Sequence, residues 1–460
     1  MTTVDQNQLS AQRAFFQSGR TQSYQFRREA LGKLRSAIEA HEEQIFAALE
    51  ADLGKGSFEA YTSEIGFVYQ EIRHAQKHLK RWMRPERVPT ALVSMPAKSY
   101  VERAPKGVVL IISPWNYPFQ LLMAPVVAAI AAGNALVLKP SELAPETSAV
   151  IQSVITSAFD PSYASVYLGD GSELVPALFE AIDFDLLFFP GSLQVGRIIS
   201  PMPAERHTPL TLADGGKSPA IVHKDAEVAQ AARRVMYGKT MNSGQVCIAP
   251  DYLLVHTDVR QQFVDAAIEA LHEFFPDGAF AADYYGRMVN QAHFERVAGY
   301  LKEGTILHGG SIDADALQIE PTLLADISPD ARVLQEEIFG PVLPIISYRT
   351  DEELFVELRK RSHPLALYVF TTSDEFSSRV TGAVPFGGGC INDTILQIVS
   401  PHLPFGGVRS SGQGSYHGKF GFDSMTHARG MVKAPARFGL PMRYPPYSEK
   451  TLSLIRKVFS

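Results

Sequence analysis

The sequence predicts an α/β protein with a Rossmann-like parallel sheet in its first half and a second α/β domain behind it. Residues 107–112 are a glycine followed by five aliphatic residues, and such a run suits a strand buried on both faces of a parallel sheet. Strand-like and helix-like segments then alternate at short intervals, which is typical of βαβ units. The expected strands lie at 107–112, 135–139, 165–168 and 185–189, with helices at 121–132 and 145–158.

The alternation resumes at Thr211 and indicates a second α/β unit. Its expected elements are strands at 219–222, 251–255, 342–348 and 366–371, and helices at 226–239, 260–275, 291–302 and 351–360. From residue 387 onward glycine and aromatic residues dominate. The last segment, 452–459, is amphipathic, and three roles remain open for it: capping a pocket, docking on a partner, or packing on the core.

The first part of the chain, 8–86, is predicted to be helical because its apolar residues recur at spacings of three, four and seven. His74 and His78 lie four apart on the last of these helices, a spacing that zinc sites use. No third ligand stands near them in the sequence, so a solvated helix face is favoured and no metal is assigned. The proline-containing segment 84–89 ends the helix, and 90–103 reads as extended.

Size and composition narrow the class of protein. A chain of 460 residues is too long for one compact core, and 45% apolar with 20% charged residues describes an ordinary soluble globular protein. The net charge of −6, without long runs of one sign, argues against nucleic acid as the main partner. Two distant cysteines indicate a reducing compartment. We see no signal peptide and no apolar run long enough for an integral membrane span, and we expect a cytoplasmic protein.

Cys247 is the best candidate for a nucleophile. It lies in the glycine-bearing segment 241–250, directly after the helix expected at 226–239. The thiolate is the attacking form, so an active site would need to lower the pKa of this thiol with nearby donors or dipoles. For a lone cysteine, a small buried apolar residue is the more common role. The motifs elsewhere in the chain nevertheless favour the interpretation of Cys247 as a nucleophile.

Several polar or glycine residues fall at the carboxyl ends of the expected strands, where parallel sheets bind ligands. Asn116, a side-chain amide donor, follows the first strand, and Lys139 ends the second. Lys139 and Glu142 could grip a ribose, although Ser141 also makes a good helix N-cap. Gly191 and Ser192 open a helix after a strand, which suits a phosphate group, but a plain turn is equally compatible. The segment 336–341, with two glutamates beside an aromatic residue, would by itself be a surface loop.

Taken in order, these stretches resemble the aldehyde dehydrogenase superfamily over nearly the whole chain. The short N-terminus and the segment 414–419 are similar to the class 3 branch, which includes fatty and aromatic aldehyde dehydrogenases. The matching motifs are Pro114-Trp115-Asn116, Leu138-Lys139-Pro140-Ser141-Glu142, Gly191-Ser192, Gly215-Gly216-Lys217-Ser218-Pro219, Asn242-Ser243-Gly244-Gln245-Val246-Cys247, Glu336-Glu337-Ile338-Phe339-Gly340-Pro341 and Pro404-Phe405-Gly406-Gly407-Val408.

The resemblance implies a catalytic mechanism. Cys247 would attack the aldehyde carbon, and the Asn116 amide with the Cys247 N–H would hold the oxyanion of the thiohemiacetal. Hydride transfer would leave a thioester, which water then hydrolyses to the carboxylic acid. The cofactor would be NAD⁺, because Glu142 favours a free 2′-hydroxyl, with NADP⁺ as the alternative. Its binding residues would be Trp115, Lys139, Glu142, Gly191, Ser192, Glu337 and Phe339.

The chain departs from the family beside the nucleophile. Where the family usually has Glu-Leu, this sequence has Ala213-Asp214. That glutamate commonly activates the deacylating water, whereas Ala213 has no proton-accepting group. Asp214 would point to the other side of an extended backbone. We therefore expect hydrolysis to be slow or to use another base, and Glu337 could be the substitute if the cofactor moves. An acyl-transferring or deacylation-impaired relative is the alternative, and a non-catalytic cofactor-binding protein is a third. Pro190 and Arg409 also replace the usual threonine and glycine.

The resemblance also implies a domain organisation and partners. Residues 1–86 and 104–210 would form the cofactor-binding domain and 211–390 the catalytic domain. Residues 87–103 and 391–435 would form bridging or oligomerisation elements, which implies a homodimer, and 436–460 a C-terminal tail. The substrate would be a medium or long aliphatic or an aromatic aldehyde if Tyr69, Tyr117 and 394–399 line an apolar pocket. Core packing explains those residues equally well.

Overall fold

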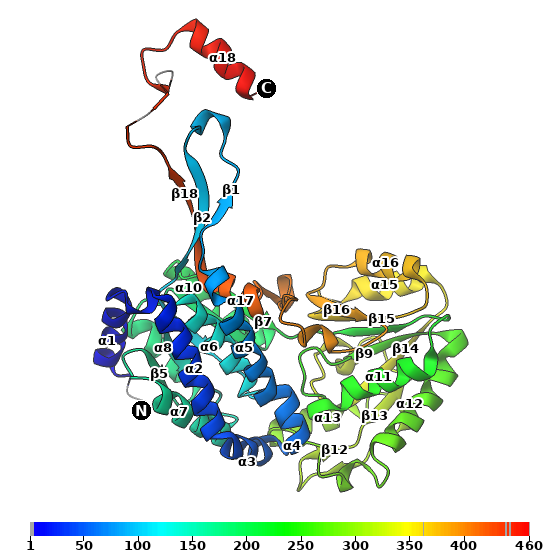
Figure 1. Ribbon diagram of the computed structural model, residues 1–460. Coiled ribbons are helices and arrows are strands. Elements are labelled where there is room, and N and C mark those ends of the chain that lie inside the picture. Colours follow the sequence, from blue (N-terminus) through cyan, green and yellow to red (C-terminus); the bar gives the residue numbers. More distant parts are fainter. Residues whose placement is uncertain (1–3, 362, 438, 441–442, 460) are drawn as a thin grey trace.

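Two α/β bodies lie side by side, and a slender arm projects from the first of them (Figure 1). The computed structural model describes residues 4–361, 363–437, 439–440 and 443–459. Each body is built around its own mostly parallel sheet, of six strands in the first and seven in the second. The α/β class expected from the sequence is confirmed.

The first sheet has the strand order β17-β7-β6-β3-β4-β5. All neighbours pair in parallel except the edge strand β17, which is antiparallel to β7. The strands are β3 (Val108–Ile112), β4 (Ala135–Lys139), β5 (Ala164–Val166), β6 (Leu186–Gly191), β7 (Leu210–Asp214) and β17 (Gly412–Gln413).

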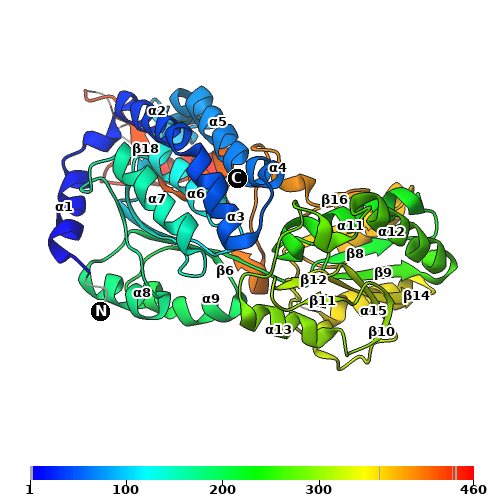
Figure 2. The same ribbon diagram turned by 90° about the horizontal axis from the view of Figure 1, so that it is seen from below.

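Helices cover both faces of this sheet, and Figure 2 shows α7 and α9 on opposite sides of it. Every residue of α6 is buried, because α6 lies between the sheet and the helices α2, α5 and α17. The helices of this body are α1 (Gln6–Gln17), α2 (Tyr24–Ala40), α3 (Glu42–Leu53), α4 (Ser57–Ala60), α5 (Gly66–Trp82), α6 (Gln120–Ala132), α7 (Pro145–Ala158), α8 (Gly171–Ala181), α9 (Leu193–Ile199), α10 (Pro201–Glu205) and α17 (Gly418–Ser424).

The position of strand β7 changes the expected boundary between the two bodies at residue 211. The sequence assigned 211–390 to the second body, but β7 pairs residue by residue with β6 of the first sheet, from Leu187↔Leu210 to Gly191↔Asp214. The first sheet therefore extends to Asp214. A short strand with a polar end gave no signal for the sheet to which it belongs.

The second sheet has the order β10-β13-β14-β9-β8-β15-β16, and only the edge strand β10 is antiparallel to its neighbour. The strands are β8 (Pro219–Val222), β9 (Tyr252–His256), β10 (Thr305–His308), β13 (Thr322–Ala325), β14 (Val342–Tyr348), β15 (Ala366–Phe370) and β16 (Gly388–Ile391). The helices are α11 (Val228–Thr240), α12 (Arg260–Phe274), α13 (Gln291–Tyr300), α14 (Arg332–Gln335), α15 (Asp351–Lys360) and α16 (Asp374–Ala383). A two-stranded ribbon, β11 (Ile312–Asp313) and β12 (Gln318–Ile319), completes it.

The arm is a three-stranded antiparallel sheet of β1 (Glu86–Val88), β2 (Lys98–Pro105) and β18 (Thr426–Lys433) (Figure 1). Much of 391–435 lies outside it, because β17 joins the first sheet and α17 packs on α5 and α6. The helix α18 (Glu449–Phe459) lies near the tip of the arm and contacts the turn at 92–94. Of the expected tail, residues 438, 441–442 and 460 lie outside the described residues. No helix in the described ranges combines the length and apolarity needed to cross a bilayer.

Candidate active site

A strained turn presents Cys247 between α11 and β9. Asn242, Ser243 and Gly244 all have positive φ angles, of 47°, 51° and 74°. Such a conformation is rare for residues other than glycine and is often kept at functional sites. At Gly244 a Cβ atom would lie 2.3 Å from the carbonyl oxygen of Gly340, so only glycine fits. The turn is thereby locked against the loop that carries Glu337.

Hydrogen bonds join the Cys247 loop to the end of β3 in the other body. The Asn116 side-chain amide donates to the Gln245 carbonyl oxygen (Nδ2–O, 3.0 Å), and the Asn242 amide donates to the Asn116 carbonyl oxygen (2.8 Å). Gln245 is itself fixed, because its side chain donates to the Arg287 carbonyl (2.9 Å). The structure therefore brings Asn116 together with the Cys247 loop, as the sequence predicted.

The environment of the thiol differs from the expectation. Burial raises the pKa of the Cys247 thiol to about 12, and the Glu337 carboxylate adds to that rise. The N–H groups of Cys247 and Ile248 oppose the shift only in part. In the protein alone the pKa of Cys247 is thus shifted upward, opposite to the lowering that an activated thiolate requires. A base must take the proton before the sulfur can attack.

Glu337 is the carboxyl group whose charge raises the pKa of this thiol. Its Oε1 accepts a hydrogen bond from the Gly216 N–H at 3.1 Å, and a Cβ at Gly215 would lie 2.3 Å from the other carboxyl oxygen. Burial, aided by the negative charge of Asp251, raises the pKa of Glu337 to about 8. A group that titrates near neutrality can serve as a general base.

The loop that carries Glu337 is held by a buried lysine. Lys217 forms an ion pair with Asp251 and donates to the carbonyl oxygens of Val333 (2.9 Å) and Glu336 (2.7 Å). Asp251 also accepts a hydrogen bond from the Ile338 N–H at 2.8 Å. The motif Gly215-Gly216-Lys217 thus packs around Glu337 from both sides, a role that the sequence did not reveal.

Ala213 and Asp214 occupy opposite sides of β7. Ala213 is buried between Pro190 of β6 and Gly412 of β17. Asp214 faces α9 instead, because a Cβ at Gly196 would lie 2.7 Å from its Oδ1. Burial raises the pKa of Asp214 to about 6, against the opposing charge of Arg197. Asp214 therefore does not stand in for the glutamate that position 213 lacks.

The residues expected to bind the adenine ribose meet at the carboxyl end of β4. Lys139 and Glu142 form an ion pair there, and the Gly171 N–H donates to Glu142 at 3.4 Å. A Cβ at Gly171 would lie 3.2 Å from the Lys139 ammonium nitrogen. This cluster offers both a cation and an acceptor for hydroxyl groups, which is the donor set that a nucleotide ribose requires.

Gly191 and Ser192 lie at the start of α9, at the carboxyl end of β6. Ser192 caps this helix by accepting a hydrogen bond from the Val195 N–H at 3.3 Å. A Cβ at Gly191 would lie 2.2 Å from the Phe189 ring, so a side chain is excluded there. The free N–H groups of a helix start suit the charge of a pyrophosphate. These residues fit the cofactor expected from the sequence.

Trp115 and Phe339 meet on the other side of the site. Their rings lie edge to face with centroids 5.3 Å apart, and His293 packs on Trp115 at 5.0 Å. Phe339 has a φ of +49°, which turns the chain sharply after Glu337. The structure thus groups Trp115 with the Glu337 loop and leaves it apart from the contacts of Lys139 and Glu142.

Two aromatic residues proposed for an apolar pocket have different surroundings. The Tyr69 hydroxyl donates to Glu42 at 2.7 Å and its ring lies under the Arg35 guanidinium, so Tyr69 packs among the N-terminal helices. Tyr117 is buried, and its pKa is raised well above the usual value, first by burial and then by the charges of Glu59, Glu64 and Cys247. Tyr117 is therefore within electrostatic range of Cys247, whereas core packing explains Tyr69.

The partly exposed histidines at 74 and 78 pack against a third histidine. His402 brings its ring to 4.9 Å from that of His74, and the ring of His78 lies 4.5 Å from His74. Burial lowers the pKa of His74 to about 4, and the other two histidines add to this. Nothing in the sequence linked residue 402 to this helix. Within the described part of the chain, no group of His, Cys, Asp and Glu has the arrangement of a metal site.

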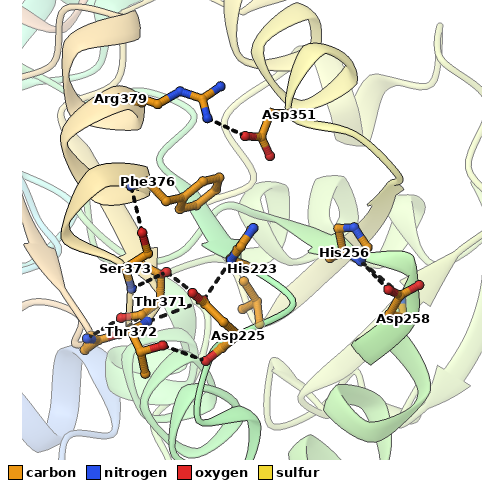
Figure 3. A network of polar contacts seen from close by, with 12 residues as sticks. His223, Asp225, His256, Asp258, Asp351, Thr371, Thr372, Ser373, Phe376 and Arg379 are labelled. Carbon is orange, nitrogen blue, oxygen red and sulfur yellow. Dashed lines mark hydrogen bonds and ion pairs between the residues drawn. The ribbon is translucent and has the colours of Figure 1, made fainter.

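A second polar network lies at the carboxyl ends of β8 and β15 (Figure 3). Asp225 accepts hydrogen bonds from His223 Nδ1 (2.8 Å) and the Thr371 hydroxyl (2.7 Å), and the Phe376 ring stacks on His223. Cys247 precedes β9, at the opposite end of this sheet. The network ties β8 to β15 and to the start of α16, which Ser373 caps. Its role is structural.

Asp225→Ala is expected to destabilise the protein by about 1–3 kcal/mol, since it leaves the partly buried donors of His223 and Thr371 without their acceptor. Burial alone would raise the pKa of Asp225, but hydrogen bonds from Thr371 and His223 outweigh it and hold that pKa below its usual 3.8. The stabilisation is therefore present above that value and is lost as the pH falls through the lowered pKa. Urea unfolding at pH 7 measures the effect. Asp258→Ala, an exposed neighbour in Figure 3, is the control and should change stability little.

Comparison with known proteins agrees with this geometry. A family model described as "Aldehyde dehydrogenase family" matches residues 2–431. The 4,4'-diaponeurosporen-aldehyde dehydrogenase of Staphylococcus aureus is 43% identical over 95% of each chain. A dog enzyme named "Aldehyde dehydrogenase, dimeric NADP-preferring" is 40% identical over 94% of this chain and 96% of its own.

The solved structures agree as well. A substrate-bound Staphylococcus aureus AldH superposes with a TM-score of 0.97, at 41% identity and over 100% of both chains. The two chains therefore share the same overall fold. The whole-chain match and the meeting of Cys247, Asn116 and Glu337 lead to one conclusion: this chain belongs to the aldehyde dehydrogenase family.

Proposed function

We propose that the protein oxidises aldehydes to carboxylic acids with NAD(P)⁺ through a covalent Cys247 thioester. The observation that carries this proposal is the junction of the two bodies, where the Asn116 amide bonds to the loop of Cys247 beside Glu337. A nucleophile, a side-chain amide donor and a carboxyl of raised pKa are the groups that acyl chemistry needs. When bound, the dinucleotide supplies the hydride acceptor.

In the first half-reaction Glu337 takes the proton of the Cys247 thiol, and the sulfur attacks the aldehyde carbon. The oxygen of that carbon becomes negatively charged. The Asn116 amide, which otherwise donates to Gln245, and the Cys247 N–H would stabilise it. One donor of this kind typically contributes about 10²–10³-fold in rate. Loss of hydride from the thiohemiacetal leaves the thioester on Cys247.

In the second half-reaction the thioester must meet an activated water. Ala213 cannot accept a proton, and Asp214 faces α9, so Glu337 is the remaining carboxyl near the thiol. We propose that hydrolysis is slow and depends on Glu337. The buried alanine also favours the second candidate, an enzyme that passes its acyl group to a thiol or amine instead of water.

Stopped-flow mixing with excess aldehyde and NAD⁺ tests the proposal. The expected result is a burst of NADH close to one per chain, followed by a slower steady phase, with an acyl adduct on the peptide that contains Cys247. A folded sample that forms no NADH would contradict the function. Linear, fast kinetics without a burst would leave the function intact and contradict slow hydrolysis. Faster turnover on adding coenzyme A or another thiol would support acyl transfer.

For the cofactor we propose a preference for NAD⁺ over NADP⁺, because the Glu142 carboxylate would repel a 2′-phosphate. The preference has to be measured, since the dog relative is named NADP-preferring. Glu142→Gln removes the charge and keeps the shape. It is expected to raise kcat/KM for NADP⁺ about tenfold relative to NAD⁺, which corresponds to a free-energy difference of about 1.4 kcal/mol. An unchanged ratio would remove Glu142 from the choice of cofactor.

We further propose medium or long aliphatic or aromatic aldehydes as substrates, because Tyr117 lies beside the reacting thiol. A homodimer is proposed because the arm carries exposed apolar residues, including Leu92, Val432 and Met431. Light scattering near the chain mass of 50.6 kDa would contradict the dimer. We propose a cytoplasmic location, in keeping with two unpaired cysteines, and cell fractionation would test it.

A further inference from the structure

A buried ion pair stands behind the oxyanion donor. Lys55, just after α3, and Glu64, before α5, have fully buried side chains and bind each other directly. Burying two charges is costly, and replacing such a pair with apolar residues often does not reduce stability. A contribution to stability alone therefore explains the pair poorly. The other contacts of Lys55 and Glu64 indicate a different role.

Those contacts are to the two ends of the loop that carries Asn116. The Lys55 ammonium donates to the Asn116 carbonyl oxygen at 3.0 Å and lies 3.8 Å from the centre of the Tyr117 ring. The Glu64 carboxylate accepts from the Gln120 N–H at 2.7 Å, where α6 begins. One ion pair thus fixes both the first and the last residue of the segment 116–120.

The same carbonyl of Asn116 has a second donor from the nucleophile loop. Asn242 Nδ2 reaches it at 2.8 Å, while the Asn116 amide bonds to Gln245 at 3.0 Å. The backbone of Asn116 is therefore held from two directions, by Lys55 behind it and by the Cys247 loop in front. With its backbone fixed, the Asn116 amide has little freedom to turn away from the reacting oxygen.

The backbone conformation around Lys55 and Glu64 places their two charged side chains. Gly54 ends α3 in the left-handed conformation, with φ of 65°. At Gly56 a Cβ would lie 2.9 Å from the Tyr284 backbone, so glycine lets the Lys55 loop pack closely. Glu64 lies in a π-helical turn, Tyr61–Ile65. Such turns are rare and frequently occur at functional sites, because they redirect one side chain from the regular helical path.

We propose that Lys55 and Glu64 are positioning residues of the oxyanion hole, which set the placement of the Asn116 amide for acylation of Cys247. This inference rests on the proposed function. Neither residue touches the substrate. A displacement of about 1 Å in a reacting group can cost about 10²-fold in rate, so loss of the pair should slow acylation without weakening cofactor binding.

The test replaces both charges at once, because removing one would leave the other buried and unpaired. Lys55→Gln combined with Glu64→Gln keeps similar shapes and polar ends. The acylation rate, measured as the NADH burst in a single turnover, is expected to fall about 10- to 100-fold. The dissociation constant for NAD⁺, measured by titration in the absence of aldehyde, should stay within about twofold.

The matched control is Glu71→Gln. Glu71 is also a buried glutamate of this helical region, and it too accepts a backbone N–H, from Gly418 at 2.9 Å. Burial raises its pKa to about 7, as burial also raises the pKa of Glu64. The control variant should lower the melting temperature but leave the acylation rate near that of the wild type.

A combination with Asn116→Ala separates positioning from general damage. If the pair acts through Asn116, adding the double replacement to Asn116→Ala should slow acylation little further, because coupled residues are not additive. Equal slowing in both backgrounds, or acylation at the wild-type rate, would overturn the inference. If the double variant does not fold, Glu64→Gln alone is introduced into the wild type and into Asn116→Ala. The acylation rates of these two proteins are then interpreted in the same way. A wild-type protein with no burst would instead reject the proposed function.

Discussion

Glutamate in place of Ala213 is expected to raise the steady-state rate of acid formation by about 10²-fold, within the 10²–10⁴ that general-base assistance typically contributes. Side chains alternate along an extended chain, so residue 213 shares its side with residue 215 and not with Asp214. At Gly215 that side faces the Glu337 carboxyl group, because a Cβ there would lie 2.3 Å from it. A carboxyl at position 213 would therefore enter the region of Glu337 and the Cys247 thioester.

Ala213→Gln is the control, because glutamine has the size of glutamate but cannot act as the base. Pre-steady-state kinetics separates the two half-reactions. Ala213→Glu should leave the burst rate nearly unchanged and raise the steady phase until the burst disappears, whereas Ala213→Gln should retain the wild-type pattern. Similar melting temperatures of the two variants exclude misfolding as the cause. A steady rate that stays at the wild-type value in Ala213→Glu would show that the lack of a general base does not limit the rate of hydrolysis.

Much of the fold could be predicted from local patterns. The strands at 135–139 and 219–222 and the helices at 145–158 and 351–360 have the expected limits. Each is an uninterrupted apolar run or a periodic segment with a clear start, such as Pro145 at the first turn of α7. Elements without such signals were missed, among them α8 and α16, whereas the helix that follows Gly191 and Ser192 was expected. Residues 211–214 were assigned to the second body, because the strand β6 that pairs with them lies elsewhere in the chain.

The residues of the site also fall into two groups, those that the sequence could predict and those that it could not. Cys247, Asn116 and Glu337 carry ordered motifs, and the structure places them together. Lys55 and Glu64 carry no motif, because their roles depend on contacts to Asn116 and Gln120 more than 50 residues away. A lysine and a glutamate in a helical region look like surface residues in a sequence, and only the packing of α3 on α7 and of α5 on α6 shows that they are buried.

The electrostatics of the thiol could not be read from the sequence either. A glycine-rich segment after a helix suggested an activated cysteine, but burial and the Glu337 carboxylate raise the pKa of Cys247. The pKa of the thiol is raised to about 12, and the pKa of the Glu337 carboxyl group is raised to about 8. The pKa of Cys247 therefore depends in part on Glu337, whose loop is held by Lys217 from a different part of the chain.

Glu337→Gln is expected to lower both the burst rate and the steady rate by about 10²-fold or more, because one carboxyl serves as base in both half-reactions. In the wild type the base form is the carboxylate. The pKa of Glu337 is raised to about 8, so the group is protonated below that pH and the rates should increase as the pH rises through it. In Glu337→Gln this increase should vanish. Burst and steady rates measured between about pH 6 and pH 9.5 test both statements.

Two variants make this last prediction sharper. Gln335→Glu places a carboxyl on the exposed surface nearby and should not change the pH profile. Ala213→Glu combined with Glu337→Gln separates the two proton transfers, because the new glutamate can assist the water while the thiol still lacks its base. That double variant should hydrolyse its thioester quickly but form it slowly, so NADH would appear without a burst. A fast burst in either Glu337 variant would mean that the Cys247 proton leaves by another route.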